Sequence, residues 1–420
     1  MPRKSFLFLQ GVCSPFFSRL AQQLRADGHA VCRVNFNVGD ALYWLEGGGV
    51  HHRGDVAKLT GLLDHIYAEH DITDQLMFGD QRPVHRPAVL HGEACGVRNH
   101  VFEEGYFRPY WVTLEREGVN GHSLLPRDPD WFMAAGEALP DYGDGAPFES
   151  SFLARSVHDV IYHLAGFWNP LLYPGYRTHA PVTAPVEYAA YLWRLQRVKR
   201  LHANDNVQIN QLADSAKCYY VLPLQLNSDA QIRYHSHYTD MTEVLSEVLL
   251  SFARHAPSDA LLVIKNHPLD IGLVDYAGFL RQKERELDLA GRIVYLESGN
   301  LHKLVAHARG VITVNSTVGG VSLGLACPTI ALADPIYNLP GLTFQHGLDR
   351  FWLNASAPEP ELFRRFRNTV IHATQINGGF YCKAGIAMAV AQSAAVLGSE
   401  RSPLELLLEM YPANTNGLCR

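Results

Sequence analysis

The chain has 420 residues, of which 47% are hydrophobic and 19% charged, and its formal net charge is −6. This composition is typical of a soluble globular protein and excludes a disordered one, while the length predicts two domains. The acidic balance argues against a protein that coats nucleic acid, and none is expected as a partner. Seven scattered cysteines without a C-x-x-C pair predict neither a disulfide framework nor a zinc knuckle, so we expect a reducing cytoplasm.

The first half of the chain alternates short apolar runs with helical segments. Helices are expected over 15–27 and 56–69. Apolar runs before, between and after these helices end in "QG" at 10–11, "FN" at 36–37, "GD" at 79–80 and "EEG" at 103–105. This pattern predicts a parallel α/β sheet. Open sheets of this kind bind ligands beyond the carboxyl ends of their strands, so these four run ends are the expected site region.

Residues 118–205 are richer in Pro, Gly, Asp and aromatic side chains and predict an irregular extension with one helix over 186–202 and a linker near 202–210. A second α/β series follows from residue 219. We therefore expect a first domain over 1–205 and a second over 206–420, both Rossmann-like and facing a cleft, as in GT-B glycosyltransferases. Dinucleotide and P-loop motifs are absent, and no apolar stretch is long enough to span a bilayer, so any membrane contact is expected to be peripheral.

The segment "VITVNSTVGGVSLGLA" at 311–326 predicts a strand that ends just before a helix. Asn315, Ser316 and Thr317 supply amide and hydroxyl groups at that junction. A helix N-terminus with free N–H groups is a ready anion site, which favours phosphate binding. The alternative is an ordinary helix cap, because the same residue types are preferred there whatever the function.

"VIKNHP" at 263–268 places Lys265 and His267 at the end of another apolar run. Pro268 disfavours the helical region for His267 and holds it extended at the strand end. By alternation this strand belongs to the same sheet as 311–314, so His267 is expected near residues 315–317. A histidine there can donate to a phosphate and assist its departure, although a structural role is the usual one for a single histidine.

"FEEGYFRP" at 102–109 places Glu103 and Glu104 at a strand end before Gly105. Successive strand side chains point to opposite faces, so one carboxylate is expected to enter the cleft while the other braces it. A carboxylate in a cleft can act as base, nucleophile or stabiliser of positive charge, and the alternative is a solvated acidic turn.

"YLWRLQRVKRLH" at 191–202 combines aromatic and basic residues on one predicted helix. Such a helix can lie on an anionic membrane surface through residues such as Trp193 and Arg197. It can equally be a solvated basic face with an aromatic anchor in the core. No metal site is expected, because the histidines lack a ligand spacing such as H-E-x-x-H.

Ordered blocks between residues 5 and 382 resemble the capsule polysaccharide biosynthesis and export family. They include "FLFLQGVCSPFF", "NFNVGD", "FGDQRPVH", "FEEGYFRP", "VNGHSLLPRDPDWF", "LPLQLNSDAQIRYHS", "LVIKNHPLD", "VITVNSTVG", "GLTFQHGLDRFW" and "TQINGGFY". Within that family the chain looks most like the Kps/Lip-type members that act as β-Kdo transferases. Ten blocks in order are far more specific than any one of them.

The resemblance implies a cytoplasmic glycosyltransferase that associates peripherally with the inner membrane. Its donor would be CMP-Kdo and its acceptor a phosphatidylglycerol-type lipid, which makes the glycolipid linker for capsular polysaccharide synthesis and export. A β product from this donor means retention, which a carboxylate can achieve by double displacement. No cofactor or metal is implied beyond the CMP-sugar, and the capsule synthesis and export machinery is a further possible partner.

The resemblance also implies residue roles. His267 would contact the CMP phosphate, Glu104 would be the catalytic carboxylate and Glu103 its support, although relatives often carry Asp in this acidic pair. Lys265 or Arg108 is assigned to the sugar carboxylate on charge and position alone. The expected substrate-binding residues are Lys265, Pro268, Asn315, Ser316, Thr317, Arg108 and Gly105.

Two other functions remain open on the sequence. A non-catalytic capsule export component would bind the glycolipid without turning over a CMP-sugar. A transferase for another CMP-linked acid sugar, such as sialic acid, would share the same motifs.

Overall fold

The computed structural model describes residues 3–149, 151–177, 184–215, 217–227, 232 and 235–413. The chain forms two compact units. Unit 1 comprises Met1–Pro126, Ala134–His179 and Arg367–Arg420, and unit 2 comprises Arg127–Met133 and Ala180–Phe366. Among the described residues, no helix combines the length and the apolar character that crossing a membrane requires.

This division corrects the predicted boundary between residues 205 and 206. That point falls inside helix α8 (Ala184–Asp214), which also runs through the predicted linker at 202–210. The C-terminal residues return to unit 1, where strand β12 (Gln375–Asn377) pairs with β6 (Trp111–Arg116). Periodicity reports only local structure, so it could not show which sheet the last segment joins.

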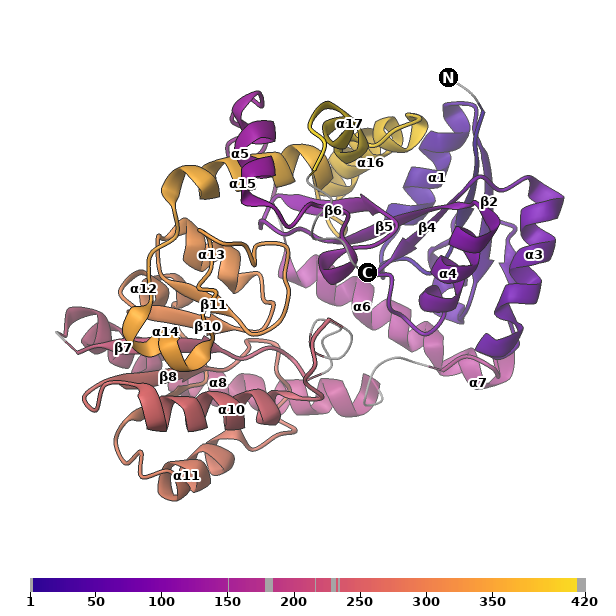
Figure 1. The fold of residues 1–420 in the computed structure, drawn as a ribbon. Helices are drawn as coiled ribbons and strands as arrows, with labels where there is room; N and C mark the ends of the chain where they lie inside the picture. The colour runs from indigo at the N-terminus through magenta and orange to yellow at the C-terminus, as the bar shows by residue number, and fades with distance from the viewer. Residues whose placement is uncertain are drawn as a thin grey trace. The chain divides into compact units, whose positions relative to one another are not determined.

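Unit 1 is built on a seven-stranded sheet (Figure 1). Its first five strands in the chain are parallel to one another, whereas β6 and β12 are antiparallel additions at one edge. The strand order is β12-β6-β5-β4-β1-β2-β3. The remaining strands are β1 (Ser5–Phe8), β2 (Ala30–Asn35), β3 (Val50–His51), β4 (Asp74–Phe78) and β5 (Arg98–Glu104).

Helices cover both faces of this sheet. On one face, Phe16 and Leu20 of α1 (Phe16–Ala26) share a buried core with Ile386 of α16 (Lys383–Gly398). On the other face, α3 (Leu59–His70) and α4 (His85–Cys95) bury a second apolar cluster. Shorter or peripheral elements are α2 (Val38–Tyr43), η1 (Val56–Lys58), η2 (Asn120–His122), α6 (Phe152–Ala165), η3 (Gly166–Trp168), α7 (Asn169–Leu172) and α17 (Pro403–Met410). Helix α5 (Pro129–Glu137) begins in unit 2 and ends in unit 1.

Unit 2 has a five-stranded, fully parallel sheet with the order β11-β10-β7-β8-β9 (Figure 1). One face packs on α10 and α14 through residues such as Val244 and Trp352, and the other packs on α8 and α12 through Ile209 and Leu304. The strands are β7 (Tyr219–Pro223), β8 (Leu261–Lys265), β9 (Ile293–Leu296), β10 (Gly310–Thr313) and β11 (Thr329–Ala331). The helices are α10 (Met241–His255), α11 (Tyr276–Glu286), α12 (Leu301–Ala306), α13 (Val318–Gly324) and α14 (Leu348–Asn354), and α15 (Pro360–Thr374) begins in unit 2 and ends in unit 1.

Both sheets have the order of a doubly wound fold. In each unit the chain adds two strands on one side of the first strand and then returns to add the next strands on the other side. The reversal lies between β1 and β4 in unit 1 and between β7 and β10 in unit 2. Two Rossmann-like α/β units are therefore confirmed, and the carboxyl ends beside each reversal are where such sheets bind ligands.

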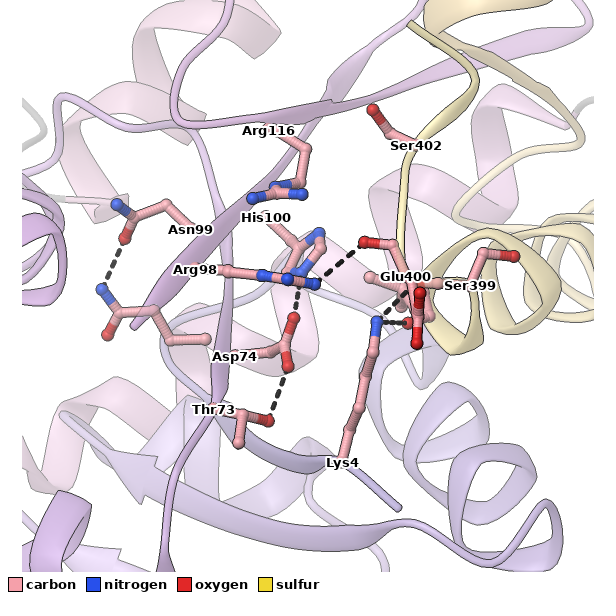
Figure 2. Close-up of polar contacts among 12 residues, drawn as sticks. Lys4, Thr73, Asp74, Arg98, Asn99, His100, Arg116, Ser399, Glu400 and Ser402 are labelled. Atoms are coloured by element: carbon pink, nitrogen blue, oxygen red, sulfur yellow. Dashed lines mark hydrogen bonds and ion pairs between the residues drawn. The ribbon is translucent and has the colours of Figure 1, made fainter. Parts of the chain in front are cut away.

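A polar cluster ties the C-terminal segment to the amino ends of the unit 1 strands (Figure 2). Lys4 precedes β1, and its Nζ donates to the carbonyl oxygens of Leu397 at 2.7 Å and Ser399 at 2.5 Å. Arg98 donates to the carbonyl of Glu400 at 2.9 Å. Burial lowers the pKa of Lys4. These bonds cap the end of α16 with charged donors, which fixes that helix on the sheet.

Asp74 and His100 form the buried centre of the same cluster (Figure 2). His100 Nε2 lies 2.7 Å from Asp74 Oδ1, and Thr73 donates its hydroxyl to Asp74 Oδ2 at 2.6 Å. Burial lowers the pKa of His100. Burial alone would raise the pKa of Asp74, but the hydrogen bonds from His100 and Thr73 lower it overall. The folded pair is therefore a neutral imidazole that donates to a carboxylate.

This pair predicts acid sensitivity. On unfolding, His100 regains an ordinary pKa of about 6.5, so below that pH the unfolded chain binds a proton that the folded chain does not. Stability is thus lost as the pH falls through about 6.5 toward the lower pKa of the folded group, by up to ~1.4 kcal/mol per pH unit for this one group. His100→Gln keeps an N–H donor for Asp74 but does not titrate, so its unfolding midpoint should fall less over the same range, as measured by scanning calorimetry.

His65→Gln is the matched control, because His65 is exposed on α3. It should keep the pH dependence of the unsubstituted protein. An equal slope in His100→Gln and in the unsubstituted protein would contradict the assignment of His100 as a buried neutral group.

Candidate functional site

In unit 2, three neighbouring strands end in polar side chains at one edge of the sheet. His267 follows β8, Gln225 follows β7, and residues 315–317 follow β10. Because the three strands are parallel and adjacent, their carboxyl ends share an edge and span about 10 Å. The predicted shared sheet of His267 and residues 315–317 is confirmed.

His267 is held in a defined orientation. Its backbone N–H donates to Asn266 Oδ1 at 2.7 Å, and its ring Nδ1 accepts the backbone N–H of Leu269 at 3.1 Å. A neutral ring that accepts at Nδ1 carries its proton on Nε2. His267 therefore presents the tautomer that can donate from Nε2 to an anionic oxygen.

A buried network lies beneath this turn. Asn266 donates its side-chain N–H groups to Tyr295 at 2.8 Å and to Glu297 at 3.2 Å. Arg194 of α8 pairs with Glu297 at 3.0 Å and with Asp270 at 2.5 Å. The network joins α8 to the ends of β8 and β9, so it fixes the backbone that carries His267.

The basic helix at 191–202 lies within α8, and both predicted readings of it stay predictions, although Arg194 serves neither of them. Arg194 is only 8% exposed and makes buried ion pairs, so it is not available to a membrane surface. Trp193 is 73% exposed, so it is not an anchor in the core. The side chains of residues 191, 192 and 195 lie outside the described ones. Sequence spacing could not show that Arg194 is buried while Trp193 beside it is exposed.

Residues 315–317 join β10 to α13. Asn315 is buried, where its Oδ1 accepts from Gln225 at 3.1 Å and its Nδ2 donates to the carbonyl of His235 at 3.2 Å. Ser316 Oγ accepts the backbone N–H of Val318 at 3.2 Å. This bond closes a local turn just before α13, whose N-cap Thr317 makes no side-chain capping hydrogen bond, so the capping alternative stays a prediction. Phosphate binding by this segment stays a prediction.

Lys265 and Pro268 have different surroundings. Lys265 is buried, and burial lowers the pKa of its ammonium group although Asp205 of α8 opposes that effect. Pro268 is exposed beside His267. Burial leaves the Lys265 side chain little surface to offer, so its pairing with a sugar carboxylate remains a prediction.

In unit 1, Glu103 and Glu104 end β5. Glu103 Oε1 accepts the backbone N–H of Glu104 at 3.0 Å, so Glu103 braces the strand end. Glu104 Oε1 is buried without a hydrogen bond, and Arg155 Nη1 of α6 lies 3.2 Å away as an ion-pair partner. This buried oxygen is therefore held by the charge of Arg155 and not by an aligned hydrogen bond.

Arg155 and Tyr381 surround Glu104 with a cation and an aromatic ring. The guanidinium lies 5.0 Å from the ring centre of Tyr381. Burial alone would lower the pKa of Arg155, but Tyr381 and Glu104 raise it overall. Burial, reinforced by the Glu104 charge, raises the pKa of Tyr381. The group therefore contains a cation and a neutral phenol beside the Glu104 carboxylate.

Gly105 allows the chain to turn directly after this carboxylate. A Cβ on Gly105 would lie 2.2 Å from the backbone oxygen of Trp111 in β6. Arg108, which was assigned to the sugar carboxylate, follows this turn and is exposed. Gly105 is therefore required for close strand packing, and its expected contact with substrate is untested.

The substitution Gly105→Ala should destabilise unit 1 by roughly 1–3 kcal/mol, because the backbone of β6 must move. Gly61→Ala is the matched control: a Cβ there meets nothing within 4 Å, and Gly61 lies in α3. It should stabilise the protein by about 0.5–1 kcal/mol. Urea unfolding measures both changes, and an unchanged midpoint for Gly105→Ala would contradict the predicted steric conflict.

Other polar groups and hollows lie away from the strand ends. In unit 1, Asp64, His91 and Cys95 could hold a metal ion, but they stand on α3 and α4, which cover a face of the sheet. In unit 2, a cavity of about 560 Å³ is lined by the second half of α10 and by residues 346–350. That half of α10 leads to the amino end of β8, the edge opposite His267.

Comparison with known proteins identifies the family. The model of the "Capsule polysaccharide biosynthesis protein" family matches residues 73–381. The chain belongs to the capsule polysaccharide biosynthesis family. The resemblance predicted from the sequence is thereby confirmed.

Two relatives within this group are similar over most of their length. The chain is 34% identical to the capsule polysaccharide export protein KpsS of Escherichia coli over 381 residues, covering 90% of this chain and 97% of KpsS. It is 34% identical to the capsule polysaccharide modification protein LipB of Neisseria meningitidis serogroup B over 388 residues, covering 90% of this chain and 92% of LipB.

A solved structure, the β-Kdo 2,7 transferase of Thermosulfurimonas dismutans KpsC, aligns with 93% of this chain and 98% of its own. The TM-score is 0.44 and the sequence identity 15%.

Sequence reasoning missed several side chains beside the strand ends of this capsule-family chain. Arg155 and Tyr381 lie beside Glu104 in unit 1. In unit 2, Gln225 follows β7, the strand between those that lead to His267 and to residues 315–317. Within residues 118–205, the part before residue 186 was expected to be irregular. The sequence therefore predicted no helix that contains Arg155. The apolar spacing of α6 over 152–165 is the signal that could have predicted that helix.

Proposed function

We propose that this capsule-family chain is a retaining β-Kdo glycosyltransferase that transfers Kdo from CMP-Kdo to a phosphatidylglycerol-type lipid. The product would be the glycolipid linker on which capsular polysaccharide is built before export. The proposal places the protein in the cytoplasm, at the inner membrane surface, with CMP-Kdo as donor and no metal or other cofactor.

The observation that carries the proposal is the contrast between the two sets of strand ends. Unit 1 offers the Glu104 carboxylate, with an oxygen that makes no hydrogen bond. Unit 2 offers donors: the Nε2 proton of neutral His267 and the groups of residues 315–317. Departure of a sugar from CMP creates positive charge at the ketosidic carbon and negative charge on the phosphate. The two sets match these two charges.

Retention can proceed in two displacements. In the first, the carboxylate of Glu104 bonds to the ketosidic carbon while the bond to the phosphate oxygen breaks, and CMP leaves with that electron pair. His267 donates to the phosphate as its charge grows. In the second, the lipid hydroxyl attacks the same carbon, its proton passes to a base, and the carboxylate is released. Arg155 pairs with the Glu104 carboxylate before the first displacement and again after the second, when that group carries its charge.

The decisive test is incubation of the full chain with CMP-Kdo and a phosphatidylglycerol analogue, followed by mass spectrometry of the lipid. We expect lipid carrying Kdo and one CMP released for each Kdo added. Turnover of CMP-sialic acid in place of CMP-Kdo would contradict the donor assignment.

The E. coli relative is called an export protein, and this favours a second function. In that case the chain would bind a Kdo-containing glycolipid without binding or cleaving a CMP-sugar. Calorimetry with CMP separates the two functions, because only the transferase is expected to bind it.

A further inference from the structure

Helix α6 carries its polar anchors on the side that faces its own unit. Tyr162 is held by Asp40 at 3.0 Å, by Asn37 at 2.7 Å and by Gln10 at 3.2 Å. Arg155, seven residues earlier, pairs with Glu104. Residues seven apart lie on the same side of a helix, so α6 lies across the strand ends of unit 1 with this polar side inward.

The opposite side of α6 is apolar and exposed. Leu153, Val157, Val160 and Leu164 fall within about 60° of one another on the helix and about 180° from Tyr162. An ordinary surface helix buries its apolar stripe and exposes its polar one. The arrangement of α6 is the reverse, which indicates that its outer side meets an apolar environment.

The exposed apolar surface continues beyond α6 through η3 and α7. Phe167 of η3 is 79% exposed and Leu171 of α7 74%, while Leu153 of α6 is 71% exposed. Elsewhere in the described residues, exposed large apolar side chains occur singly or in pairs along the sequence. We call the following set the apolar outer face: Phe152, Leu153, Val157, Val160, Ile161, Leu164, Phe167, Trp168, Leu171 and Leu172.

The charges around this face suit an anionic lipid surface. Asp159 is the single acidic residue of segment 152–172, and it lies 3.6 Å from His163. Arg177 follows the end of the segment and is exposed. Arg53 is also exposed and lies nearby, because Gly175 donates its N–H to the carbonyl of Arg53 at 3.2 Å. Trp168 adds a ring of the kind enriched at membrane interfaces. Apolar side chains with aromatic and basic residues at their border are typical of interfacial helices.

We propose that the apolar outer face inserts into the headgroup region of an anionic bilayer. Since α6 is about 10 Å across, the inserted face would hold Glu104 roughly one helix diameter from the lipid headgroups. This inference rests on the proposed function for the role of the lipid as acceptor, and it names the surface through which the enzyme meets that acceptor. It replaces α8 with α6 as the membrane-binding helix.

The test is flotation of the full chain with protein-free vesicles of phosphatidylcholine and phosphatidylglycerol. The triple variant Leu153→Ser, Phe167→Ser, Leu171→Ser should lower the vesicle partition coefficient at least about 10-fold, because each side chain contributes burial in the bilayer. The matched control is Leu273→Ser, Leu353→Ser, Met410→Ser, whose side chains are 56%, 63% and 63% exposed elsewhere. The control should partition within about twofold of the unsubstituted protein.

Insertion has its own spectroscopic readout. Brominated lipids quench tryptophans that enter the bilayer, so quenching should decrease in Trp168→Phe and persist in Trp193→Phe. The opposite result would assign the surface to α8 and overturn the proposal. Equal flotation of the triple variant and the unsubstituted protein would also overturn it, as would binding of this face to another protein without binding to vesicles.

Failure of the proposed function would look different. A short-chain, water-soluble acceptor removes the need for a bilayer, so the triple variant should transfer Kdo to it at the unsubstituted rate. If no variant transfers Kdo to any acceptor but flotation still depends on the apolar outer face, the transferase assignment fails and the membrane surface stands.

Discussion

Glu104→Gln is expected to lower Kdo transfer at least about 10²-fold, because the amide neither attacks the ketosidic carbon nor stabilises its positive charge. The fold should persist, since the substitution keeps the shape of the side chain. The measurement is CMP release from CMP-Kdo in the presence of the lipid acceptor, together with circular dichroism and the unfolding midpoint. CMP binding by calorimetry should be unchanged, because Glu104 is assigned to the sugar and not to the nucleotide.

Two further carboxylates serve as comparisons. Glu103→Gln removes the charge from the neighbour that holds the Glu104 backbone, so a smaller loss is expected. Glu46→Gln removes a carboxylate that pairs with Arg25 away from β5, and it should retain full activity. Full activity in Glu104→Gln would remove the catalytic role assigned to it, and a larger loss in Glu103→Gln would exchange the two roles.

His267→Ala is expected to cost about 10²-fold in transfer rate and to weaken CMP binding, because the donor to the departing phosphate is lost. His267→Gln should retain more activity, since an amide N–H can donate from nearly the same place but cannot transfer a proton. Calorimetry with CMP and initial rates with CMP-Kdo measure the two parts separately.

The control for this pair is His255→Ala, at the end of α10 and at the amino edge of β8. It pairs with Asp349 on the surface, and removing it should leave transfer unchanged. Unchanged CMP binding and rate in His267→Ala would refute its assignment to the phosphate. Loss of CMP binding without loss of rate at saturating donor would limit His267 to binding.

The sequence predicted the order of strands and helices because each element carries its own periodicity. The runs that became β7, β8 and β10 are short and apolar and end in polar or proline residues, so their boundaries could be read directly. From parallel strands it follows that His267 and residues 315–317 share an edge. The same reasoning placed Glu103 and Glu104 at the end of β5.

The surroundings of these residues could not be predicted in the same way. Arg155 reaches Glu104 from 51 positions further along the chain, in a region expected to be irregular. Arg194 was expected on a solvated or membrane-facing side, yet it is buried between Asp270 and Glu297. In both cases the partners are distant in sequence, and charge alone does not select among the many carboxylates of the chain.

The sequence by itself determined the family, the alternation of elements and the positions of the strand-end residues, because these depend on motifs and on periodicity within short segments. Only the tertiary structure decided that the C-terminal segment completes unit 1, that Glu104 pairs with Arg155, and that α6 carries its polar side inward. The physical reason is that pairing and burial depend on which distant segments the packed core brings together, and no local pattern records that choice.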